Sequence, residues 1–289
     1  MRYEGDVYRP PSEARSLIIQ LTIGCARNTC TFCNMYKRKQ FRVRKLEEVI
    51  ADLYWVKNFY PYGFDRVFLA DGDALIARTQ DIITVLDKIY ELFPHVRRVT
   101  TYGTAQDVLL KSHEELCQLR EHGLEMVYIG AETGSDKILK DIDKRVTAAE
   151  IVEACQKLKA AGIMVSMTLI TGIGGVKDSR ENAIESAKLV TAAKPEYLGL
   201  LTLNLEPGTP LEADYRSGKF EALSPFGDLE EQKIFLEHVD SEGTVLRSNH
   251  VSNYVSLSGT LNRDKERMIA QLDAAISSGR IRPERYRRL

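Results

Sequence analysis

Short β-rich runs alternate with longer helical patterns through most of the chain, and this rhythm constrains the fold more than any other feature. Each apolar run is short enough for one strand and is followed by a segment whose apolar residues recur at helical spacing. We expect strands at residues 16–23, 66–70, 97–102, 125–130, 163–170 and 196–203. We expect the helices at residues 45–60, 79–93, a segment through 122, 135–161 and 178–194.

Six strand-helix alternations imply right-handed crossovers and therefore a parallel sheet with helices outside it. The predicted fold class is α/β, a partial (β/α)6 TIM-like barrel with a C-terminal extension. We place the core at about residues 14–204 and the extension at about 205–289. Because no low-complexity linker divides the chain, residues 1–289 are expected to form a single domain. In the extension we expect a turn at 206–210, helices at 229–239 and 262–278, and a seventh strand at 244–248.

The charge balance excludes some broad functions. Forty Lys and Arg residues face 41 Asp and Glu residues, so no global field gathers nucleic acids or acidic membranes. No apolar run reaches the ~18 residues that span a bilayer, and the first fifteen residues lack the apolar centre of a signal peptide. We therefore expect a cytoplasmic protein without membrane contact. In that reducing compartment, clustered cysteines indicate metal or redox chemistry rather than disulfides.

Three of the five cysteines share one loop, with the spacing Cys25-x4-Cys30-x2-Cys33. The loop follows the first predicted strand, at the carboxyl edge where α/β folds place their sites. Such short spacings allow thiolates to converge on one metal centre. A structural zinc site requires a fourth ligand, and no histidine lies between Cys33 and His95. A plant-type 2Fe-2S ferredoxin has the same spacing but requires a fourth cysteine downstream. A zinc-binding interaction module and a 2Fe-2S electron carrier are thus the alternatives.

The two remaining cysteines are interpreted as core residues. Cys155 shares helical spacing with Ile151 and Leu158, and Cys117 lies within a helical pattern. Without them, Cys25, Cys30 and Cys33 remain as the metal ligands. A 4Fe-4S cluster held by three thiolates retains one iron without a protein ligand, where a substrate can coordinate. The loop therefore predicts a catalytic cluster.

The cysteine loop and the segments after it resemble the radical S-adenosylmethionine (radical SAM) superfamily over most of the chain. The usual spacing there is Cys-x3-Cys-x2-Cys, so this loop is a variant with one extra residue before Cys30. The resemblance implies a 4Fe-4S cluster and S-adenosylmethionine as cofactors. It also implies reductive cleavage to a 5′-deoxyadenosyl radical, which abstracts hydrogen from a substrate. The expected partner is an electron donor of the flavodoxin or ferredoxin type, whereas the substrate and the catalytic residues remain unknown.

The resemblance also implies contacts to the cofactor near the first two strands. Phe32 matches an aromatic residue that precedes the third cysteine and packs near the adenine. Asp71, Gly72 and Asp73 occupy the place of a Gly-Gly-Glu-like turn that receives the methionine ammonium. A plain Asp-Gly turn is the alternative for these three residues.

Later strands supply further matches. Glu132 ends the fourth strand, where the family binds ribose hydroxyls, and Ser135 after it is expected only to cap a helix. Gly172 and Gly174 match the glycine-bearing adenine contact after the fifth strand. The Pro-Gly-Thr-Pro turn at 207–210 recurs in the coproporphyrinogen-oxidase-like and elongator-like branches of the family.

Three polar segments lie outside these matches to the family. The segment 247–253 resembles one in uncharacterised coproporphyrinogen-oxidase-like members, which assigns no role to Arg247, His250 or Asn253. The basic run at 36–45 is expected to be a solvated face, with a binding surface for phosphates or an acidic electron donor as the alternative. The tail at 280–289 has five arginines but no base-stacking pattern, so nucleic-acid contact there is the less favoured of two open interpretations.

Overall fold

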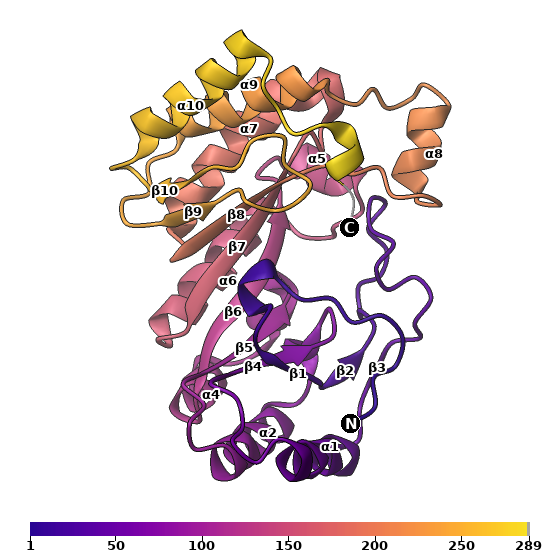
Figure 1. Cartoon of the computed structure of the whole chain (residues 1–289), viewed down its shortest axis with the longest axis vertical. Coiled ribbons are helices and arrows are strands. Elements are labelled where there is room, and N and C mark those ends of the chain that lie inside the picture. Colours follow the sequence, from indigo (N-terminus) through magenta and orange to yellow (C-terminus); the bar gives the residue numbers. More distant parts are fainter. Residues whose placement is uncertain (288–289) are drawn as a thin grey trace. The chain divides into compact units, whose positions relative to one another are not determined.

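The computed structural model in Figure 1 is described for residues 1–287. The predicted alternation of strands and helices is present. The strands are β1 (Leu17–Gln20), β2 (Thr22–Ile23), β3 (Arg42–Val43), β4 (Arg66–Ala70), β5 (Arg98–Gly103), β6 (Leu124–Glu132), β7 (Met164–Thr171), β8 (Tyr197–Thr202), β9 (Val245–Arg247) and β10 (Ser258–Thr260).

The α-helices follow the strands in the order that the sequence indicates. They are α1 (Leu46–Phe59), α2 (Thr79–Leu92), α3 (Ala105–Leu110), α4 (His113–Glu121), α5 (Asp136–Asp141), α6 (Ala148–Ala160), α7 (Gly175–Ala193), α8 (Pro210–Arg216), α9 (Pro225–His238) and α10 (Lys265–Ser278). Three short 3-10 helices complete the list: η1 (Pro11–Glu13), η2 (Ala74–Ile76) and η3 (Glu284–Tyr286).

One large sheet contains eight strands in the order β1-β4-β5-β6-β7-β8-β9-β10. The pairs β1-β4, β4-β5, β5-β6, β7-β8 and β8-β9 are parallel, and β9-β10 is antiparallel. Consecutive parallel strands joined by helices are the arrangement of a partial TIM-like barrel. The predicted fold class is therefore confirmed, and β9 is the predicted seventh strand.

The chain forms two compact units, and each draws on several stretches of the sequence. The first unit comprises residues 1–28, 35–129 and 156–165. The second comprises residues 29–34 and 130–155 and the chain from 166 onward. That residues 1–289 behave as a single domain stays a prediction.

The first unit contains β1, β4, β5 and the start of β6. Leu17 of β1 pairs with Val67 of β4, and Val67 pairs in turn with Val99 of β5. Helices α1 and α2 lie side by side in this unit (Figure 1). Its core includes Phe68, whose ring meets the Tyr102 ring edge-on at 4.9 Å. Alternating apolar residues on these strands therefore fill the space between them.

The second unit contains most of β7 together with β8, β9 and β10. The β7-β8 ladder runs from Ser166 and Tyr197 to Thr171 and Thr202. Helices α7, α9 and α10 lie side by side (Figure 1). Two of the three, α9 and α10, belong to the C-terminal extension, so the extension supplies much of this unit's helical layer.

Three predicted elements are each divided in two. The first strand, expected at 16–23, is split because Thr22 and Ile23 pair with β3 in a separate antiparallel sheet. The helical segment ending at 122 breaks where Ser112 caps α4 in a capping box. The helix expected at 135–161 breaks after α5, where Asp143 and Arg145 adopt positive φ angles of 52° and 57°. Left-handed backbone ends a helix, so α5 and α6 are separate.

Within residues 1–287, none of the helices has both the length and the apolar character needed to cross a membrane. The tail prediction at 280–289 extends to two residues, 288 and 289, that lie outside the described part of the chain.

Candidate functional site

The cysteine loop divides between the two units. Cys25 belongs to the first unit, whereas Cys30 and Cys33 belong to the second. All three side chains are half-buried, and none is in a disulfide. Within residues 1–287, no group of three or more His, Cys, Asp or Glu side chains is assembled as a metal site. The structure thus places the predicted ligands in one accessible loop without gathering them around a centre.

Asp71 holds the start of this loop in the first unit. Its Oδ2 atom accepts hydrogen bonds from the Gly24 backbone N–H at 3.0 Å and from Gln20 at 3.1 Å. The same oxygen forms an ion pair with Lys39 Nζ at 2.8 Å. Asp71 is fully buried, so its carboxylate fixes the backbone one residue before Cys25.

The basic run at 36–45 is only partly the solvated face that we expected. Lys39 turns inward to Asp71, and the Arg44 side chain is buried in an ion pair with Asp52 at 2.9 Å. The prediction is wrong for these two residues because buried carboxylates elsewhere in the chain provide them with partners. Lys37 and Arg38 are exposed as predicted.

Gly72 lies against the ring of Tyr36. A Cβ atom at position 72 would overlap that ring, so only glycine fits. Tyr36 is itself buried. We inferred that Gly72 allows another group to approach its backbone closely. Within this unit, that group is the ring of Tyr36, three residues after Cys33.

Asp73 forms the most unusual electrostatic feature of the first unit. It is 0% exposed, and neither carboxyl oxygen makes a hydrogen bond of ordinary geometry, although the Asp107 carboxyl and the Ala26 N–H lie close enough to influence its pKa. Burial, followed by the adjacent Asp107 carboxyl, raises the pKa of Asp73 to about 9. The Arg27 guanidinium lies 3.7 Å from Asp107 Oδ1. Neither Arg27 nor Asp107 was predicted as a site residue. Asp107 forms the capping box of α3 with Thr104, and the sequence pattern indicates only that role.

The tight half of the loop, Cys30 to Cys33, docks within the second unit. The Thr31 backbone N–H donates to the Ile142 carbonyl oxygen at 3.0 Å, and the Thr31 carbonyl accepts from the Leu211 N–H at 3.0 Å. Asn34 donates to Glu206 at 3.2 Å. The predicted turn at 206–210 therefore positions this half of the loop, together with the segment that follows α5.

Phe32 packs against a cluster that contains Ile138, Ile142, Ile173 and Leu211. The ring is half-buried among these side chains. An apolar ring in this cluster anchors the peptide between Cys30 and Cys33.

Glu132 ends β6 with a backbone φ of 67°, an uncommon angle for a residue with a side chain. Its carboxylate is buried and accepts a hydrogen bond from Lys144 Nζ at 2.6 Å. The same carboxylate lies where a side chain on Gly130 would be, so position 130 requires glycine. Residue Ser135 caps α5 by accepting from the Ile138 N–H, which confirms its predicted role.

Gly172 and Gly174 lie in the turn between β7 and α7. Gly172 has a φ of 78°, which favours glycine, and its N–H donates to Glu231 Oε1 at 2.7 Å. A Cβ at Gly174 would come within 2.9 Å of the Ile138 side chain. Glu231 belongs to α9 and was not predicted, because a lone glutamate in a helical pattern carries no signal of burial.

The two distal cysteines have different environments. Cys155 is fully buried, which confirms its predicted place in the core. Cys117 is half-buried rather than buried, and its Sγ lies 3.5 Å from His113 Nε2. The prediction is wrong for Cys117 because α4 buries Leu116 and Leu119, and position 117 falls to the side of that stripe.

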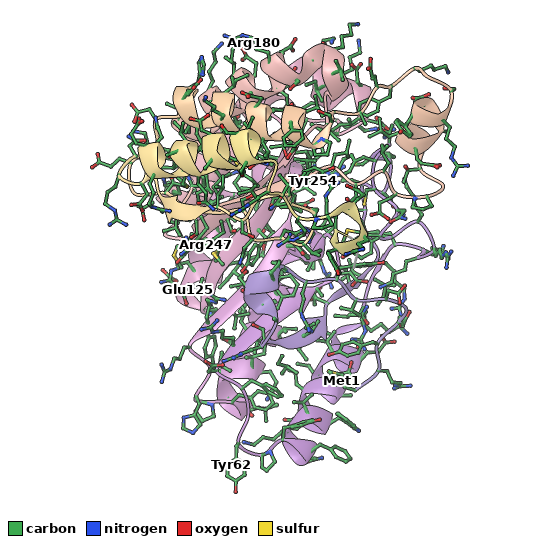
Figure 2. All side chains as sticks on the ribbon, turned by 45° about the horizontal axis from the view of Figure 1, so that its top comes forward. Met1, Tyr62, Glu125, Arg180, Arg247 and Tyr254 are labelled. Carbon is green, nitrogen blue, oxygen red and sulfur yellow. The ribbon has the colours of Figure 1, made fainter. Side chains whose placement is uncertain are left out.

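The polar segment 247–253 is mostly structural. Arg247 is exposed and Tyr254 is buried (Figure 2). Asn253 is fully buried, accepting from the Thr202 N–H at 2.7 Å and donating to the Leu200 carbonyl at 2.8 Å. His250 is half-buried, and burial lowers its pKa. Within the described residues, these contacts account for the segment's polarity.

Comparison with known proteins assigns the family. The profile of the Radical SAM superfamily matches residues 19–187, more than half of the chain. The chain belongs to the radical SAM superfamily. It is accordingly an enzyme of a family that uses a 4Fe-4S cluster and S-adenosylmethionine and that needs a reductant and a substrate. The family match decides against the ferredoxin-like and zinc-module alternatives.

Among its relatives are enzymes named for tRNA modification. The chain is 24% identical over 253 residues to threonylcarbamoyladenosine tRNA methylthiotransferase MtaB of Rickettsia prowazekii (strain Madrid E), covering 82% of this chain and 59% of that protein. It is 25% identical over 215 residues to tRNA-2-methylthio-N(6)-dimethylallyladenosine synthase of Pseudomonas fluorescens (strain Pf0-1), covering 70% of this chain and 46% of that protein. The chain spans about half the length of these curated relatives.

Solved structures share the fold at low identity. Methylornithine synthase (PylB) matches with a TM-score of 0.55 and 16% identity, covering 90% of this chain and 81% of that one. Coproporphyrinogen III oxidase (HemN) from Escherichia coli matches with a TM-score of 0.57 and 16% identity, covering 78% and 54%. These likenesses support the partial TIM-like barrel of this radical SAM enzyme.

Proposed function

We propose that Cys25, Cys30 and Cys33 hold the 4Fe-4S cluster of this radical SAM enzyme and that residues after β4, β6 and β7 hold S-adenosylmethionine. The donor set suits an iron-sulfur cluster, because the loop offers three thiols and none of them is in a disulfide. Three ligands leave one iron open for the cofactor. When bound, the cluster supplies the electron that cleaves S-adenosylmethionine to methionine and a 5′-deoxyadenosyl radical.

Asp73 is the observation that carries the cofactor proposal. A fully buried carboxyl with two unpartnered oxygens is costly, because burial removes water without replacing its hydrogen bonds. A methionine ammonium would supply both the charge and the donors. Asp71 commits its Oδ2 atom to Gly24 and Lys39 and leaves only Oδ1 without a hydrogen bond, whereas both oxygens of Asp73 lack one, so Asp73 is the acid of this turn that we assign to the ligand.

The remaining contacts follow the chain order of the family. We propose that Glu132 accepts hydrogen bonds from the ribose hydroxyls, in exchange with or in addition to its bond from Lys144. We propose that Gly172 and Gly174 allow the backbone to approach the adenine, with Phe32 packed near it. The proposed reaction would also require a substrate that gives up a hydrogen atom and an electron donor of the flavodoxin or ferredoxin type.

The test is anaerobic turnover of the reconstituted protein. After addition of iron, sulfide, dithionite and S-adenosylmethionine, we expect 5′-deoxyadenosine and methionine to accumulate slowly even without substrate. Cys25→Ala, Cys30→Ala and Cys33→Ala should each lose the 4Fe-4S absorbance and the product.

Cys117→Ala and Cys155→Ala are the matched controls and should retain iron and product. A Cys30→Ala protein that kept a full 4Fe-4S spectrum would contradict the ligand set. An intact holoenzyme that bound S-adenosylmethionine but formed no 5′-deoxyadenosine would contradict the reaction.

We propose as a second candidate that the substrate is an adenosine of tRNA, which receives a methylthio group. The printed names of the relatives support this, since they describe methylthiolation of tRNA adenosines. The reaction would need a sulfur donor, one S-adenosylmethionine for hydrogen abstraction and a second as methyl donor. Incubating the reduced holoenzyme with S-adenosylmethionine, sulfide and tRNA that lacks the modification, followed by nucleoside mass spectrometry, should reveal a 2-methylthioadenosine derivative. Formation of 5′-deoxyadenosine with unmodified tRNA would direct the search to another substrate class.

A further inference from the structure

Helix α9 carries two buried acids, Asp228 and Glu231, and both are 1% exposed. The helix lies in the C-terminal extension, outside the residues that match the family profile. Hydroxyl and side-chain amide groups donate to both carboxylates, and Glu231 also accepts from a backbone N–H. Burying a carboxylate among neutral donors is expensive, so the position of these acids calls for an explanation.

Glu231 accepts hydrogen bonds from the first residue of the glycine turn that follows β7 and from the helix α7 that comes after the turn. Its Oε1 atom accepts from the Gly172 N–H at 2.7 Å and from Asn182 Nδ2 at 2.7 Å. Its Oε2 atom accepts from Ser179 Oγ at 2.5 Å. Asn182 and Ser179 belong to the first turns of α7, so one carboxylate ties the turn to the helix that follows it.

The conformation of Gly172 depends on such a tie. Glycine adopts many backbone conformations readily, so its φ of 78° must be held by hydrogen bonds, and within the turn the Gly172 carbonyl already accepts from the Gly175 N–H at 3.0 Å. The bond to Glu231 supplies a partner for the Gly172 N–H, and charge-assisted hydrogen bonds of this kind are about twice as strong as neutral ones. Burial raises the pKa of Glu231 to about 7, which measures how strongly its surroundings oppose the charge.

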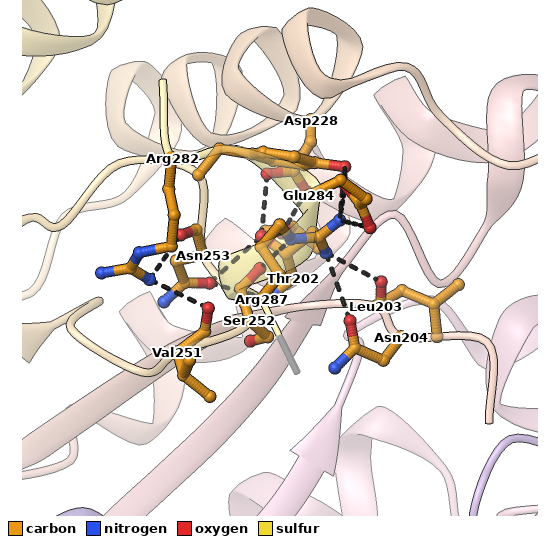
Figure 3. A network of polar contacts seen from close by, with 12 residues as sticks. Thr202, Leu203, Asn204, Asp228, Val251, Ser252, Asn253, Arg282, Glu284 and Arg287 are labelled. Atoms are coloured by element: carbon orange, nitrogen blue, oxygen red, sulfur yellow. Dashed lines mark hydrogen bonds and ion pairs between the residues drawn. The ribbon is translucent and has the colours of Figure 1, made fainter. Parts of the chain in front are cut away.

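Asp228 and its neighbours hold the strands behind this turn. Asp228 accepts from Thr171 Oγ1 at 2.5 Å and from Thr202 Oγ1 at 2.9 Å, at the ends of β7 and β8. Figure 3 shows Thr202 also bonded to Asn253, while Arg282 and Arg287 of the C-terminal tail donate to the carbonyls of Asn253 and Ser252. The extension thus fixes the strand ends through Asp228 and leaves the turn itself to Glu231.

We propose that Glu231 is a positioning residue that holds the Gly172 turn in its binding conformation and thereby sets the affinity for S-adenosylmethionine. The inference rests on the proposed function, because it takes the Gly172 turn as a contact of that cofactor. Glu231 touches neither the cofactor nor the reacting atoms in this scheme. It acts through the backbone of Gly172.

The test compares isosteric variants of the reconstituted holoenzyme. Glu231→Gln keeps the shape but presents an amide N–H to a cluster of donors, so the bond to Gly172 is weakened. We expect about tenfold weaker S-adenosylmethionine binding by calorimetry, within the range for loss of one charge-assisted hydrogen bond. Iron content should be unchanged. Hydrogen exchange should be faster at the amides of residues 172–175.

Two controls separate positioning from general destabilisation. Glu230→Gln removes a charge from an exposed neighbour on the same helix and should leave affinity unchanged. Leu272→Ala opens a cavity beside α10 and should lower the midpoint of thermal unfolding without weakening cofactor binding in the folded fraction. Glu231→Asp, which retains the charge with a shorter reach, should restore part of the affinity.

The outcomes are distinguishable. Glu231→Gln protein that bound S-adenosylmethionine as tightly as the wild type would overturn the positioning role and leave the proposed function intact. Equal weakening in Leu272→Ala would also overturn it, because stability alone would then explain the effect. Wild-type holoenzyme that bound no S-adenosylmethionine would reject the proposed function, and the role of Glu231 with it.

Discussion

Asp73 and Glu132 show how single buried acids relate to the proposed chemistry. Asp73 makes no hydrogen bond of ordinary geometry, whereas Glu132 is already paired with Lys144. The sequence places both at the carboxyl ends of strands, but their protonation and pairing depend on residues far along the chain. The two acids therefore require different tests.

Replacing Glu132 with Ala should weaken S-adenosylmethionine binding by roughly 1.5 to 3 kcal/mol, the range for a charge-assisted hydrogen bond. Iron content should not change, because Glu132 is not a proposed ligand. Calorimetry on the reconstituted protein measures the effect. Lys144→Met is the control, since it removes the ion pair but leaves the carboxylate. Unchanged affinity of Glu132→Ala for S-adenosylmethionine would show that Glu132 has only a structural role.

Asp73 makes stability depend on pH. Its folded pKa of about 9 lies above the usual value of 3.8, so the folded state binds more protons between these limits. The free energy of unfolding of the wild type should therefore fall as the pH rises from about 4 to 9. Asp73→Asn carries no charge to bury, so its free energy of unfolding should not fall in this way. The variant should therefore become more stable relative to the wild type from pH 6 to pH 9, by a difference that grows with pH. Urea unfolding of the cluster-free protein checks this, and a constant difference would contradict it.

At the scale of elements, the short helix α5 and the turn after it support the cysteine loop. Ser135 caps the helix, and Ile142 at its C-terminal end accepts a hydrogen bond from the Thr31 N–H. Thr29 donates to the carbonyl of Asp143 at 3.2 Å. The sequence predicts one long helix here, because the apolar spacing continues across a break that two left-handed residues create.

Ser135→Ala should destabilise the protein by about 1 kcal/mol, since the Ile138 N–H loses its capping acceptor. Ser135 also donates to Glu181, so a loss toward the upper end of the capping range is expected. Ser135→Asp, which restores an acceptor, should recover part of the stability. Thermal unfolding of the three proteins measures the effect, and equal midpoints would show that the cap contributes nothing.

At the scale of the whole molecule, the C-terminal tail is a structural strap. Arg287 is 3% exposed and donates to the carbonyl oxygens of Ser252 and Leu203 and to Glu284. Its guanidinium also lies 3.8 Å from the centre of the Tyr254 ring. Arg282 donates to the carbonyls of residues 250, 251 and 253. Two of the tail's arginines thus bind the chain itself.

Arg287→Ala should cost about 2 to 3 kcal/mol of stability, because buried carbonyl oxygens lose their donor. Hydrogen exchange should be accelerated at residues 250–254 and at the end of β8. Arg285→Ala, which removes a cation stacked on the exposed ring of Tyr286, is the matched control and should have little effect. Equal stability of the two variants would contradict the strap.

A single domain should unfold in one transition. The chain passes between the two units at five points in the sequence, so neither unit is built from one continuous stretch. We expect one calorimetric peak whose calorimetric and van't Hoff enthalpies agree. Two resolved transitions would show that the units are separate domains.

The sequence determined the strand-helix order, the family and the candidate ligands of this protein. Strand β4 coincides with its predicted bounds, and α1, α2 and β9 lie within two residues of theirs. Apolar periodicity is a local property, so it can be read without knowing the fold. The cysteine spacing is local as well, since all three thiols lie within nine residues of the chain.

Only the tertiary structure decided which polar side chains are buried and what they hold. Lys39 pairs with Asp71, Asp73 lies beside Asp107, and Glu231 binds Gly172 across 59 positions of the sequence. A lysine or glutamate has the same local pattern whether it faces water or a partner. Its burial is favourable only when a distant group satisfies it, and that pairing is set when the strands and helices pack together.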